Sequence, residues 1–250
     1  MLLTGIVQGG SKYARTLGFP TLNIPLVEVV LSGVYIGRVW LDERYFDAAV
    51  FADEKRGIIE AHLLDFSKEV DALPIEIELA EKIRDRGVFS DEIDLKKAIT
   101  GDVEKVRAWS AAHPVRVMVF GTFDSIHKGH ENMFQQACAL APHVELVVSV
   151  ARDSAVVRIK KASPRHSEDE RTAQLAAHPL VSRAVIGDEV GYMHHIAEAH
   201  PDIIALGYDQ SGEYVEQLED SIRKYSLHIH TVRLNPLEPH IYKTSLLSPR

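Results

Sequence analysis

The sequence predicts two domains of different fold class: an antiparallel β-barrel with a C-terminal helix, then an α/β domain built on a doubly wound, Rossmann-like parallel sheet. Two observations predict this. Up to about residue 82, apolar residues fall in short β-rich runs separated by turn residues, whereas from residue 115 apolar strands alternate with helical stretches. At 250 residues, the chain is long enough for two cores. We place the domains at 1–111 and 115–250.

Four β-rich runs and one helix define the first domain. The predicted strands cover residues 33–40, 45–51, 58–64 and 74–79. Within the last of them, Ile75 to Leu79 alternate apolar and acidic residues, as a half-exposed antiparallel strand does. A helix from Asp91 to about Ala111 follows, because apolar residues recur there at helical spacing. These residues are Leu95, Ile99, Val103, Val106 and Trp109.

Strands and helices alternate in the second domain. Strands are predicted at 115–120, 144–151, 181–186, 202–206 and 228–234, and helices at 129–141, 168–177, 191–199 and 213–226. Ligands of parallel sheets bind at the carboxyl ends of the strands, near the point where strand order reverses. Polar residues follow three predicted strands, at 121–130, 151–154 and 207–210. The sequence therefore predicts a pocket at this edge.

Composition excludes several function classes. The net charge is −8 and no run is rich in lysine or arginine, which argues against a nucleic-acid partner. No apolar stretch approaches membrane-spanning length and no signal peptide is evident, so we expect a cytoplasmic protein without a membrane partner. Cys138 is the single cysteine, which excludes an internal disulfide and a cysteine-built zinc site. Its apolar helical neighbours predict a buried position.

A glycine turn followed by two histidines carries the strongest chemical signal. Gly121-Thr122-Phe123-Asp124 ends an apolar strand, and His127-x-Gly129-His130 begins a helical stretch. Helix N-termini attract phosphate through unpaired N–H groups and partial positive charge. Imidazole donors there stabilise charge that builds on phosphates during attack at phosphorus, and Gly129 lets a triphosphate approach the backbone. The pattern predicts a site for a nucleoside triphosphate.

With further motifs in the same order, the second half resembles the cytidylyltransferase-like superfamily, and within it the archaeal-type FAD synthetases, which adenylylate FMN. The motifs are Gly121-Thr122-Phe123-Asp124, His127-x-Gly129-His130, Lys160-Lys161, Glu170-Arg171, Gly207-Tyr208-Asp209-Gln210 and Lys243-Thr244-Ser245. The resemblance implies that the FMN phosphate attacks the α-phosphorus of ATP and expels pyrophosphate.

The resemblance also implies a role for each motif. His127 and His130 would hold the α- and β-phosphates, and Lys160 or Lys161 would neutralise the leaving pyrophosphate. Mg²⁺ is implied because it usually bridges transferring phosphates. The nucleotide contacts would come from Gly121, Thr122, Phe123, Gly129, Arg171, Gly207, Tyr208, Asp209, Lys243, Thr244 and Ser245. Structural alternatives stay open: a solvated pair for Lys160-Lys161, a helix-face pair for Glu170-Arg171, and a helix cap for Asp209.

The first half resembles the riboflavin kinases of the bacterial and eukaryotic type. Gly18-Phe19-Pro20-Thr21-Leu22-Asn23 is similar to the family's Gly-Phe-Pro-Thr-Ala-Asn motif, and 32–35 and 59–66 match two further segments in order. The resemblance implies that Gly18 and Pro20 contact the nucleotide, and that Thr21 and Asn23 offer oxygens to Mg²⁺. Glu60 would be the general base that deprotonates the ribityl 5′-hydroxyl.

The leading hypothesis is a bifunctional transferase with riboflavin, FMN and ATP as small-molecule substrates and Mg²⁺ as its metal. The sequence does not determine the oligomeric state. Residues 51–56 replace the Asn-Pro-Thr-like segment that riboflavin kinases carry before the glutamate strand. One alternative is therefore an FAD synthetase whose first domain binds flavin without catalysis. Another is a cytidylyltransferase acting on a polyol phosphate. Most remaining histidines, including His194-His195, are expected on the surface.

Overall fold

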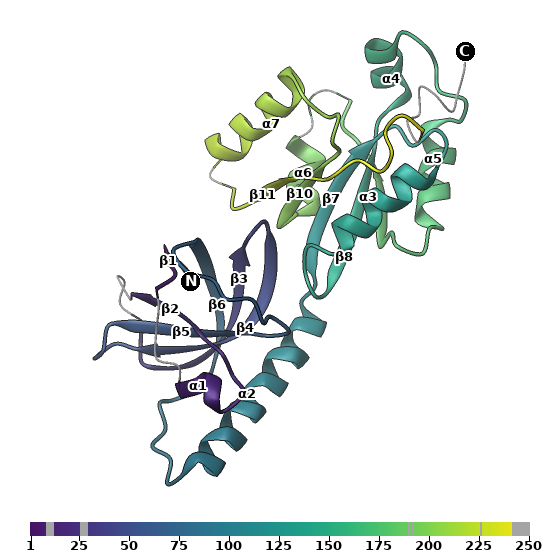
Figure 1. The fold of residues 1–250 in the computed structure, drawn as a ribbon. Coiled ribbons are helices and arrows are strands. Elements are labelled where there is room, and N and C mark those ends of the chain that lie inside the picture. The colour runs from purple at the N-terminus through teal and green to yellow at the C-terminus, as the bar shows by residue number, and fades with distance from the viewer. Residues whose placement is uncertain (9–12, 26–29, 190, 192, 226, 242–250) are drawn as a thin grey trace. The chain divides into compact units, whose positions relative to one another are not determined.

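The computed structural model of the chain describes residues 1–8, 13–25, 30–189, 191, 193–225 and 227–241 (Figure 1). The chain divides into two compact units, Met1–His113 and Pro114–Arg250. Each unit has its own sheet and its own core.

The first unit is an antiparallel barrel with a long C-terminal helix. Its elements are β1 (Leu2–Ile6), α1 (Tyr13–Thr16), β2 (Leu22–Pro25), β3 (Gly33–Leu41), β4 (Arg44–Asp53), β5 (Ile58–Leu63), β6 (Pro74–Arg84) and α2 (Glu92–Ala112). The strands follow the order β1-β6-β3-β4-β5-β2, every pair antiparallel. The two edges meet where the N–H of Gln8 donates to the carbonyl of Asn23 (2.8 Å). The predicted barrel is confirmed.

Alternation along the strands builds the barrel core. Ile75, Ile77 and Leu79 are buried, whereas Glu76 and Glu78 between them are not, as the sequence pattern predicts. Their partners in the core come from the other five strands and include Leu3, Ile24, Val39, Val50, Ile59 and Leu63. Each such side chain contributes roughly 1.5–3 kcal/mol when it is fully buried.

Helix α2 covers one side of this barrel, against β3 and β4. Asp91 caps its N-terminus by accepting from the N–H of Asp94 (2.9 Å). The predicted apolar face packs inward, with Val106 fully buried. Two polar contacts not evident in the sequence pattern accompany it: Arg84 of β6 binds the buried Asp102 (2.8 Å), and Ser110 donates to Asp47 of β4. The short helix α1 is absent from the predicted elements.

The second unit is a doubly wound parallel sheet, as predicted. Its elements are β7 (Val115–Gly121), α3 (Lys128–Cys138), β8 (Val144–Val150), α4 (Asp153–Lys160), α5 (Glu168–Ala176), β9 (Arg183–Ile186), α6 (Met193–Ala199), β10 (Ile203–Leu206), α7 (Glu213–Lys224) and β11 (His230–Arg233). The strand order is β11-β10-β7-β8-β9. Chain order therefore reverses between β7 and β10, which are neighbours.

Helices cover both faces of this sheet (Figure 1). Helices α6 and α7 pack on one face, where Ile196 and Leu218 meet Met118 of β7 and Ile204 of β10. Helices α3 and α5 contact strands β7, β8 and β9.

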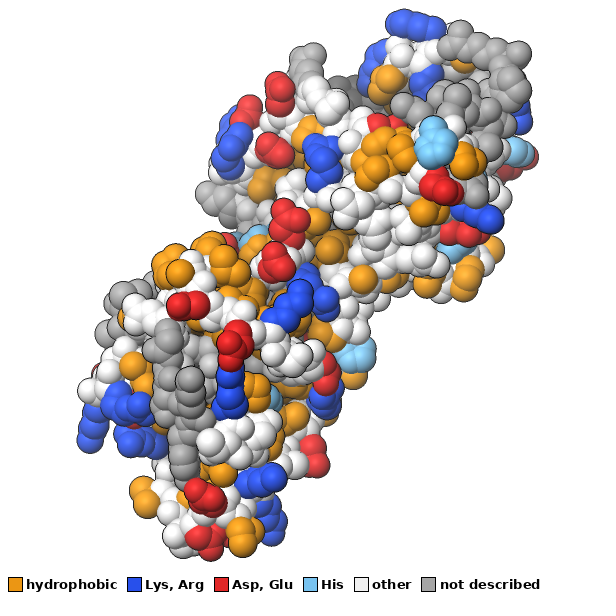
Figure 2. All heavy atoms as spheres, viewed as in Figure 1, with side chains coloured by type: hydrophobic (Ala, Val, Ile, Leu, Met, Phe, Trp, Pro, Cys, Tyr) orange, Lys and Arg blue, Asp and Glu red, His pale blue; other side chains and the backbone are white. Residues whose placement is uncertain are grey.

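On the face of the molecule shown in Figure 2, Lys and Arg side chains are scattered among acidic ones instead of forming one basic surface.

Two expectations for this unit need correction. Helix α4 is absent from the predicted elements, because the β-branched residues Val156, Val157 and Ile159 in this short segment weaken its helical signal. Cys138 is half-buried instead of buried, at the end of α3. Burial still raises the pKa of its thiol. Within the described ranges, none of the helices has the length and apolar character needed to cross a bilayer.

Candidate active sites

A cavity of about 480 Å³ opens at the carboxyl ends of β7 and β10, where the strand order reverses. Ten of the residues predicted to contact the nucleotide line it. They are Gly121, Thr122, Phe123, His127, Gly129, His130, Lys160, Gly207, Tyr208 and Asp209. We call it the switch-point cavity. Residues far apart in the sequence meet here because parallel strands bring their carboxyl ends to one edge.

Two stacked histidines stand at the start of α3 in this cavity. The ring centroids of His127 and His130 lie 3.9 Å apart, with the ring planes 22° from parallel. His127 is the N-cap residue, and its Nδ1 accepts from the N–H of Gly129 (3.1 Å). That bond leaves the proton of the neutral ring on Nε2.

Both imidazoles are held in the neutral form. Burial lowers the pKa of His130 to about 3, and the charges of His127 and Lys160 act in the same direction. Burial also lowers the pKa of His127, against the opposing effect of Glu131. Each ring can therefore offer one N–H to a phosphate oxygen without the cost of a buried cation.

The turn that precedes the histidines needs a glycine. A Cβ on Gly121 would lie 2.7 Å from the ring of Phe123, closer than side chains tolerate. Phe123 has a φ of 52° and is 2% exposed. Its ring packs edge-on against His130 (centroids 5.1 Å apart) and against Phe134. Phe123 thus lines the cavity chiefly as the support of His130.

Of the predicted lysine pair, one member faces the cavity. Lys160 lines it from the last turn of α4, and burial lowers the pKa of its ammonium group, against the charges of Asp124 and Asp209. Lys161 ends the helix in a left-handed conformation (φ 57°) and is exposed outside the cavity.

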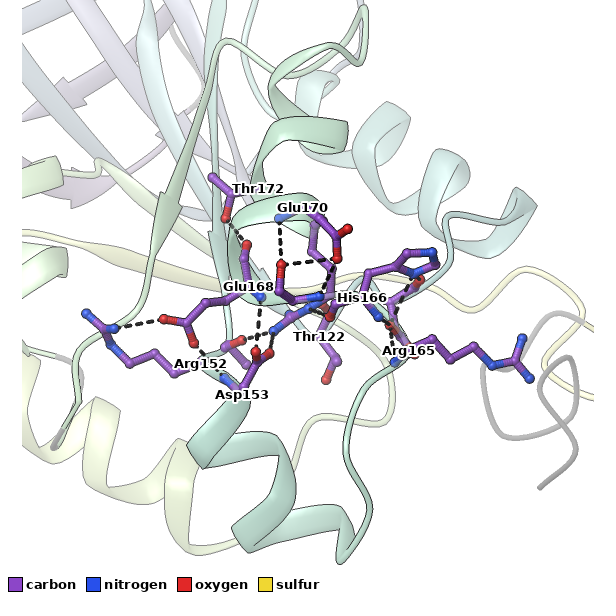
Figure 3. A network of polar contacts seen from close by, with 12 residues as sticks. Thr122, Arg152, Asp153, Arg165, His166, Glu168, Glu170 and Thr172 are labelled. Atoms are coloured by element: carbon purple, nitrogen blue, oxygen red, sulfur yellow. Dashed lines mark hydrogen bonds and ion pairs between the residues drawn. The ribbon is translucent and has the colours of Figure 1, made fainter.

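Arg171 does not line the cavity. Its side chain is fully buried, and its guanidinium donates to the carbonyls of Thr122, Ala151 and His166 and to the carboxylate of Asp153. These acceptors come from the loops after β7 and β8, the start of α4 and the loop before α5, and Figure 3 shows Thr122, Asp153 and His166 converging. This placement supports a structural role instead of the expected phosphate contact.

Glu170 closes a capping box with Ser167 at the start of α5, so it is not paired with Arg171 either. Its carboxylate accepts from the N–H of Ser167 (2.8 Å), and the Ser167 hydroxyl accepts from the N–H of Glu170 (3.3 Å).

Two side chains that sequence reasoning left without a role connect the loops around the cavity. Asp124 accepts from the N–H groups of Arg165 (2.9 Å) and His166 (3.0 Å). Gln210 accepts from the N–H of Gly207 (2.7 Å) and donates to the carbonyl of Phe120 (2.9 Å), so it joins the ends of β10 and β7. Asp124 and Gln210 are the last residues of the motifs at 121–124 and 207–210, so membership of these motifs was the sequence signal that could have identified them.

Three predicted residues lie outside the described part of the chain: Lys243, Thr244 and Ser245.

The first unit has a cavity of about 380 Å³ beside β2. Pro20, Thr21 and Asn23 line it, together with Arg15 and Lys68. Oγ1 of Thr21 is buried and has no hydrogen-bond partner among the described residues. An unpartnered hydroxyl next to an amide oxygen fits the hard-oxygen preference of Mg²⁺. We call it the Thr21 cavity.

Gly18 and Glu60 lie near the Thr21 cavity but do not line it. Gly18 has a φ of 93°, a conformation that favours glycine, in the turn before Pro20. Glu60 on β5 is the register partner of Asn23 on β2, so both side chains emerge on one face of the sheet. Oε1 of Glu60 lies 3.4 Å from a guanidinium nitrogen of Arg56.

Comparison with known proteins matches each unit separately. The riboflavin kinase family matches residues 1–110, and the cytidylyltransferase-like family matches residues 118–247. An FAD synthase of Archaeoglobus profundus is 40% identical over 131 residues, which cover 52% of this chain and 81% of the relative. An FAD synthase of Aciduliprofundum boonei is 41% identical over 120 residues, covering 48% and 78% respectively.

A solved riboflavin kinase from Trypanosoma brucei aligns with 44% of this chain and 78% of its own, at 24% identity and a TM-score of 0.34.

Proposed function

The chain belongs to the cytidylyltransferase-like family through its second domain and to the riboflavin kinase family through its first, and we propose that it converts riboflavin to FMN and FMN to FAD. The observation that carries the proposal is the pair of neutral, stacked histidines in the switch-point cavity, with Lys160 beside them. The relatives named FAD synthase match this domain and support FMN as its acceptor.

In the second domain, an oxygen of the FMN phosphate attacks the α-phosphorus of ATP. The bond from that phosphorus to the bridging oxygen breaks, and pyrophosphate leaves with the electron pair. No protein nucleophile is needed, so the side chains act by position and charge. His127 and His130 donate N–H groups to the α- and β-phosphates, and Lys160 neutralises the leaving pyrophosphate.

In the first domain, Glu60 accepts the proton of the ribityl 5′-hydroxyl as that oxygen attacks the γ-phosphorus of ATP. Thr21 and Asn23 would hold Mg²⁺, which would offset the negative charge of the phosphates. Asn23 and Glu60 are register partners on one face of the sheet, which supports a metal-binding role for Asn23 beside a general base at Glu60.

One observation favours a second candidate for the first domain, flavin binding without catalysis. Glu60 lies outside the Thr21 cavity, with Arg56 at 3.4 Å. A carboxylate held by a guanidinium outside the cavity is not placed to take a proton from a substrate bound in it.

The test is a chromatographic time course with purified protein, riboflavin, ATP and Mg²⁺. We expect FMN to appear first and then to convert to FAD with release of pyrophosphate. If riboflavin stays unchanged while added FMN becomes FAD, the first domain binds flavin only. If neither reaction occurs and CTP with glycerol 3-phosphate releases pyrophosphate, the adenylyl assignment is wrong.

Two variants assign each step to its domain. Glu60→Gln should abolish FMN formation and leave FAD formation from added FMN intact. The double variant His127→Ala/His130→Ala should do the reverse and accumulate FMN.

A further inference from the structure

A second cavity, of about 620 Å³, lies in the same unit at the carboxyl ends of β7, β8 and β9. It shares Phe120, Gly121, Thr122, Ile159 and Gln210 with the switch-point cavity, so the two cavities meet at the end of β7. We call it the β8–β9 cavity. Of the residues that line only this cavity, Ala151 and Arg152 belong to a strand end predicted to contribute to a pocket, and none was predicted to contact the nucleotide.

Helix α4 contributes to both cavities. Ile159 lines both, Lys160 lines only the switch-point cavity, and Arg158 lines only the β8–β9 cavity. Residues two apart on a helix point in nearly opposite directions, so one short helix supplies a cation to each cavity.

Two arginines line the β8–β9 cavity, and they differ in their partners. Arg152 is already engaged: it donates to the carboxylate of Glu168 (2.9 Å) and to the carbonyl of Gly187 (2.8 Å). Arg158 is exposed, and among the described residues it has neither a hydrogen bond nor an ion pair. A guanidinium held over a cavity without a protein anion is suited to a phosphate from outside.

The floor of this cavity is a connected polar set, which corrects the expectation that His195 lies on the surface. His195 is 7% exposed, and its Nε2 lies 3.0 Å from the hydroxyl oxygen of Ser149, which is 3% exposed. Its Nδ1 lies 3.0 Å from Oδ2 of Asp188.

Asp188 is fixed in turn, because its carboxylate accepts from the N–H groups of His194 and His195. Burial would raise the pKa of the Asp188 carboxyl, but His195 and these N–H groups hold it below its usual range. The ionised carboxylate favours the proton on Nδ1 of His195, so Nε2 accepts from Ser149.

The same three residue types form catalytic triads in hydrolases. There the nucleophilic serine sits on a sharp turn that exposes its oxygen. Ser149 is instead a buried residue inside β8, so the set is better suited to recognising a ligand than to attacking one.

We infer that the β8–β9 cavity binds the acceptor of the transfer reaction, a phosphate monoester on a polar ring system. This rests on the proposed function. With the triphosphate held by His127, His130 and Lys160, in-line displacement requires the acceptor oxygen to approach from the side opposite the pyrophosphate. The cavity that joins the nucleotide site at Gly121 and Thr122 provides that approach.

In this assignment Arg158 anchors the acceptor phosphate. The Ser149–His195 pair, oriented by Asp188, presents polar atoms to the hydrogen-bonding edge of the isoalloxazine ring.

The first test measures steady-state FAD formation with FMN and ATP varied separately. Arg158→Ala should raise KM for FMN roughly tenfold or more, as loss of a charged hydrogen bond does, while KM for ATP stays within about twofold. Arg158→Lys should recover part of the loss, since it keeps the charge. Arg183→Ala is the matched control, because Arg183 is an exposed arginine at the amino end of β9, away from this edge.

An unchanged KM for FMN in Arg158→Ala, or an equal rise in both KM values, would overturn the inference and leave the proposed function standing. Wild-type protein that forms no FAD at all would remove the proposed function, and the inference with it.

A second variant tests the floor independently. Ser149→Ala should lower kcat/KM for FMN roughly three- to tenfold, as loss of a neutral hydrogen bond does, with KM for ATP unchanged. FMN formation from riboflavin in the same variant serves as the internal control, since that reaction belongs to the first domain. Equal losses for FMN and ATP would contradict a role in acceptor recognition.

Discussion

At the scale of single residues, the chemistry of this protein depends on polar groups that are buried before any ligand arrives. His130 is neutral because of burial and neighbouring charge, and the buried hydroxyl of Thr21 has no hydrogen-bond partner in the part of the chain that the structure describes. Such groups cost stability, since each would be better solvated in the unfolded chain. Replacing such a group at either cavity should therefore lower activity while it maintains or raises stability.

His130 should make stability depend on pH. Its pKa is about 3 in the folded protein and about 6.5 in an unfolded chain, so between these values only the unfolded state binds the proton. Folding stability of the second domain should therefore fall as pH drops below about 6.5, by up to about 1.4 kcal/mol per pH unit from this group. His130→Gln should remove that contribution.

Denaturant unfolding followed by circular dichroism from pH 7 to pH 4.5 checks this. Tryptophan fluorescence is the internal control, because Trp40 and Trp109 both lie in the first unit. An equal pH slope in wild type and His130→Gln would contradict the prediction.

Thr21→Val tests the hydroxyl in the Thr21 cavity. Valine has nearly the same shape but no oxygen, so FMN formation should fall roughly 100-fold through loss of a metal ligand. The melting temperature should stay equal or rise, because an unpartnered buried hydroxyl is removed. FAD formation from added FMN should not change. Thr4→Val, at an exposed position of β1, is the control. A Thr21→Val protein that is stable and keeps full kinase activity would exclude Thr21 from the metal site.

At the scale of elements, loops are held around the switch-point cavity by a buried arginine. The guanidinium of Arg171 on α5 bonds groups in the loops after β7 and β8, the start of α4 and the loop before α5. Arg152 and Glu168 add a second connection between the start of α4 and α5 (2.9 Å). The short helix α4, and with it Lys160, is thus positioned by contacts from outside its own sequence.

Arg171→Met should therefore affect both folding and catalysis. It leaves three carbonyls without the donor that this side chain supplies, at an expected cost of about 3 kcal/mol or more in the unfolding free energy of the second domain, or roughly 1 kcal/mol or more for each carbonyl. FAD formation should fall with it, while FMN formation persists. Arg165→Met is the matched control, because that side chain is exposed and Asp124 binds only its backbone. Equal stability of the two variants would show that the network contributes little.

At the scale of the whole molecule, each of the two compact units has its own cavity lined by candidate site residues. The Thr21 cavity and the switch-point cavity share no residue. We therefore expect FMN formed at one site to reach the other after release to solvent.

A mixture of two full-length variants tests this independence. Thr21→Val alone should leave riboflavin almost unreacted, and His130→Asn alone should accumulate FMN. Mixed in equal amounts, they should convert riboflavin to FAD after a lag, with an FAD rate that follows the concentration of the Thr21→Val chain. Failure of the mixture, when each variant keeps its remaining activity, would mean that both sites must work on the same chain.

The sequence by itself determined the two fold classes and most of the switch-point cavity. Alternation at Ile75–Leu79 and the strand–helix succession after Pro114 are local periodicities, and local periodicity is visible in sequence. The motifs at Gly121–His130 and Gly207–Gln210 directly follow strands, so their convergence follows from the parallel sheet.

Only the tertiary structure decided which charged groups face a ligand and which face the protein. Arg171 and Lys160 are both basic residues of motifs predicted to bind phosphate. Arg171 is fully buried and donates to backbone carbonyls, whereas Lys160 lines a cavity. His195 lies 46 residues from Ser149 in the chain, and the two meet because α6 returns over the sheet. Hydrogen bonds between side chains so far apart in sequence are set by the packing of elements, and no local pattern records that packing.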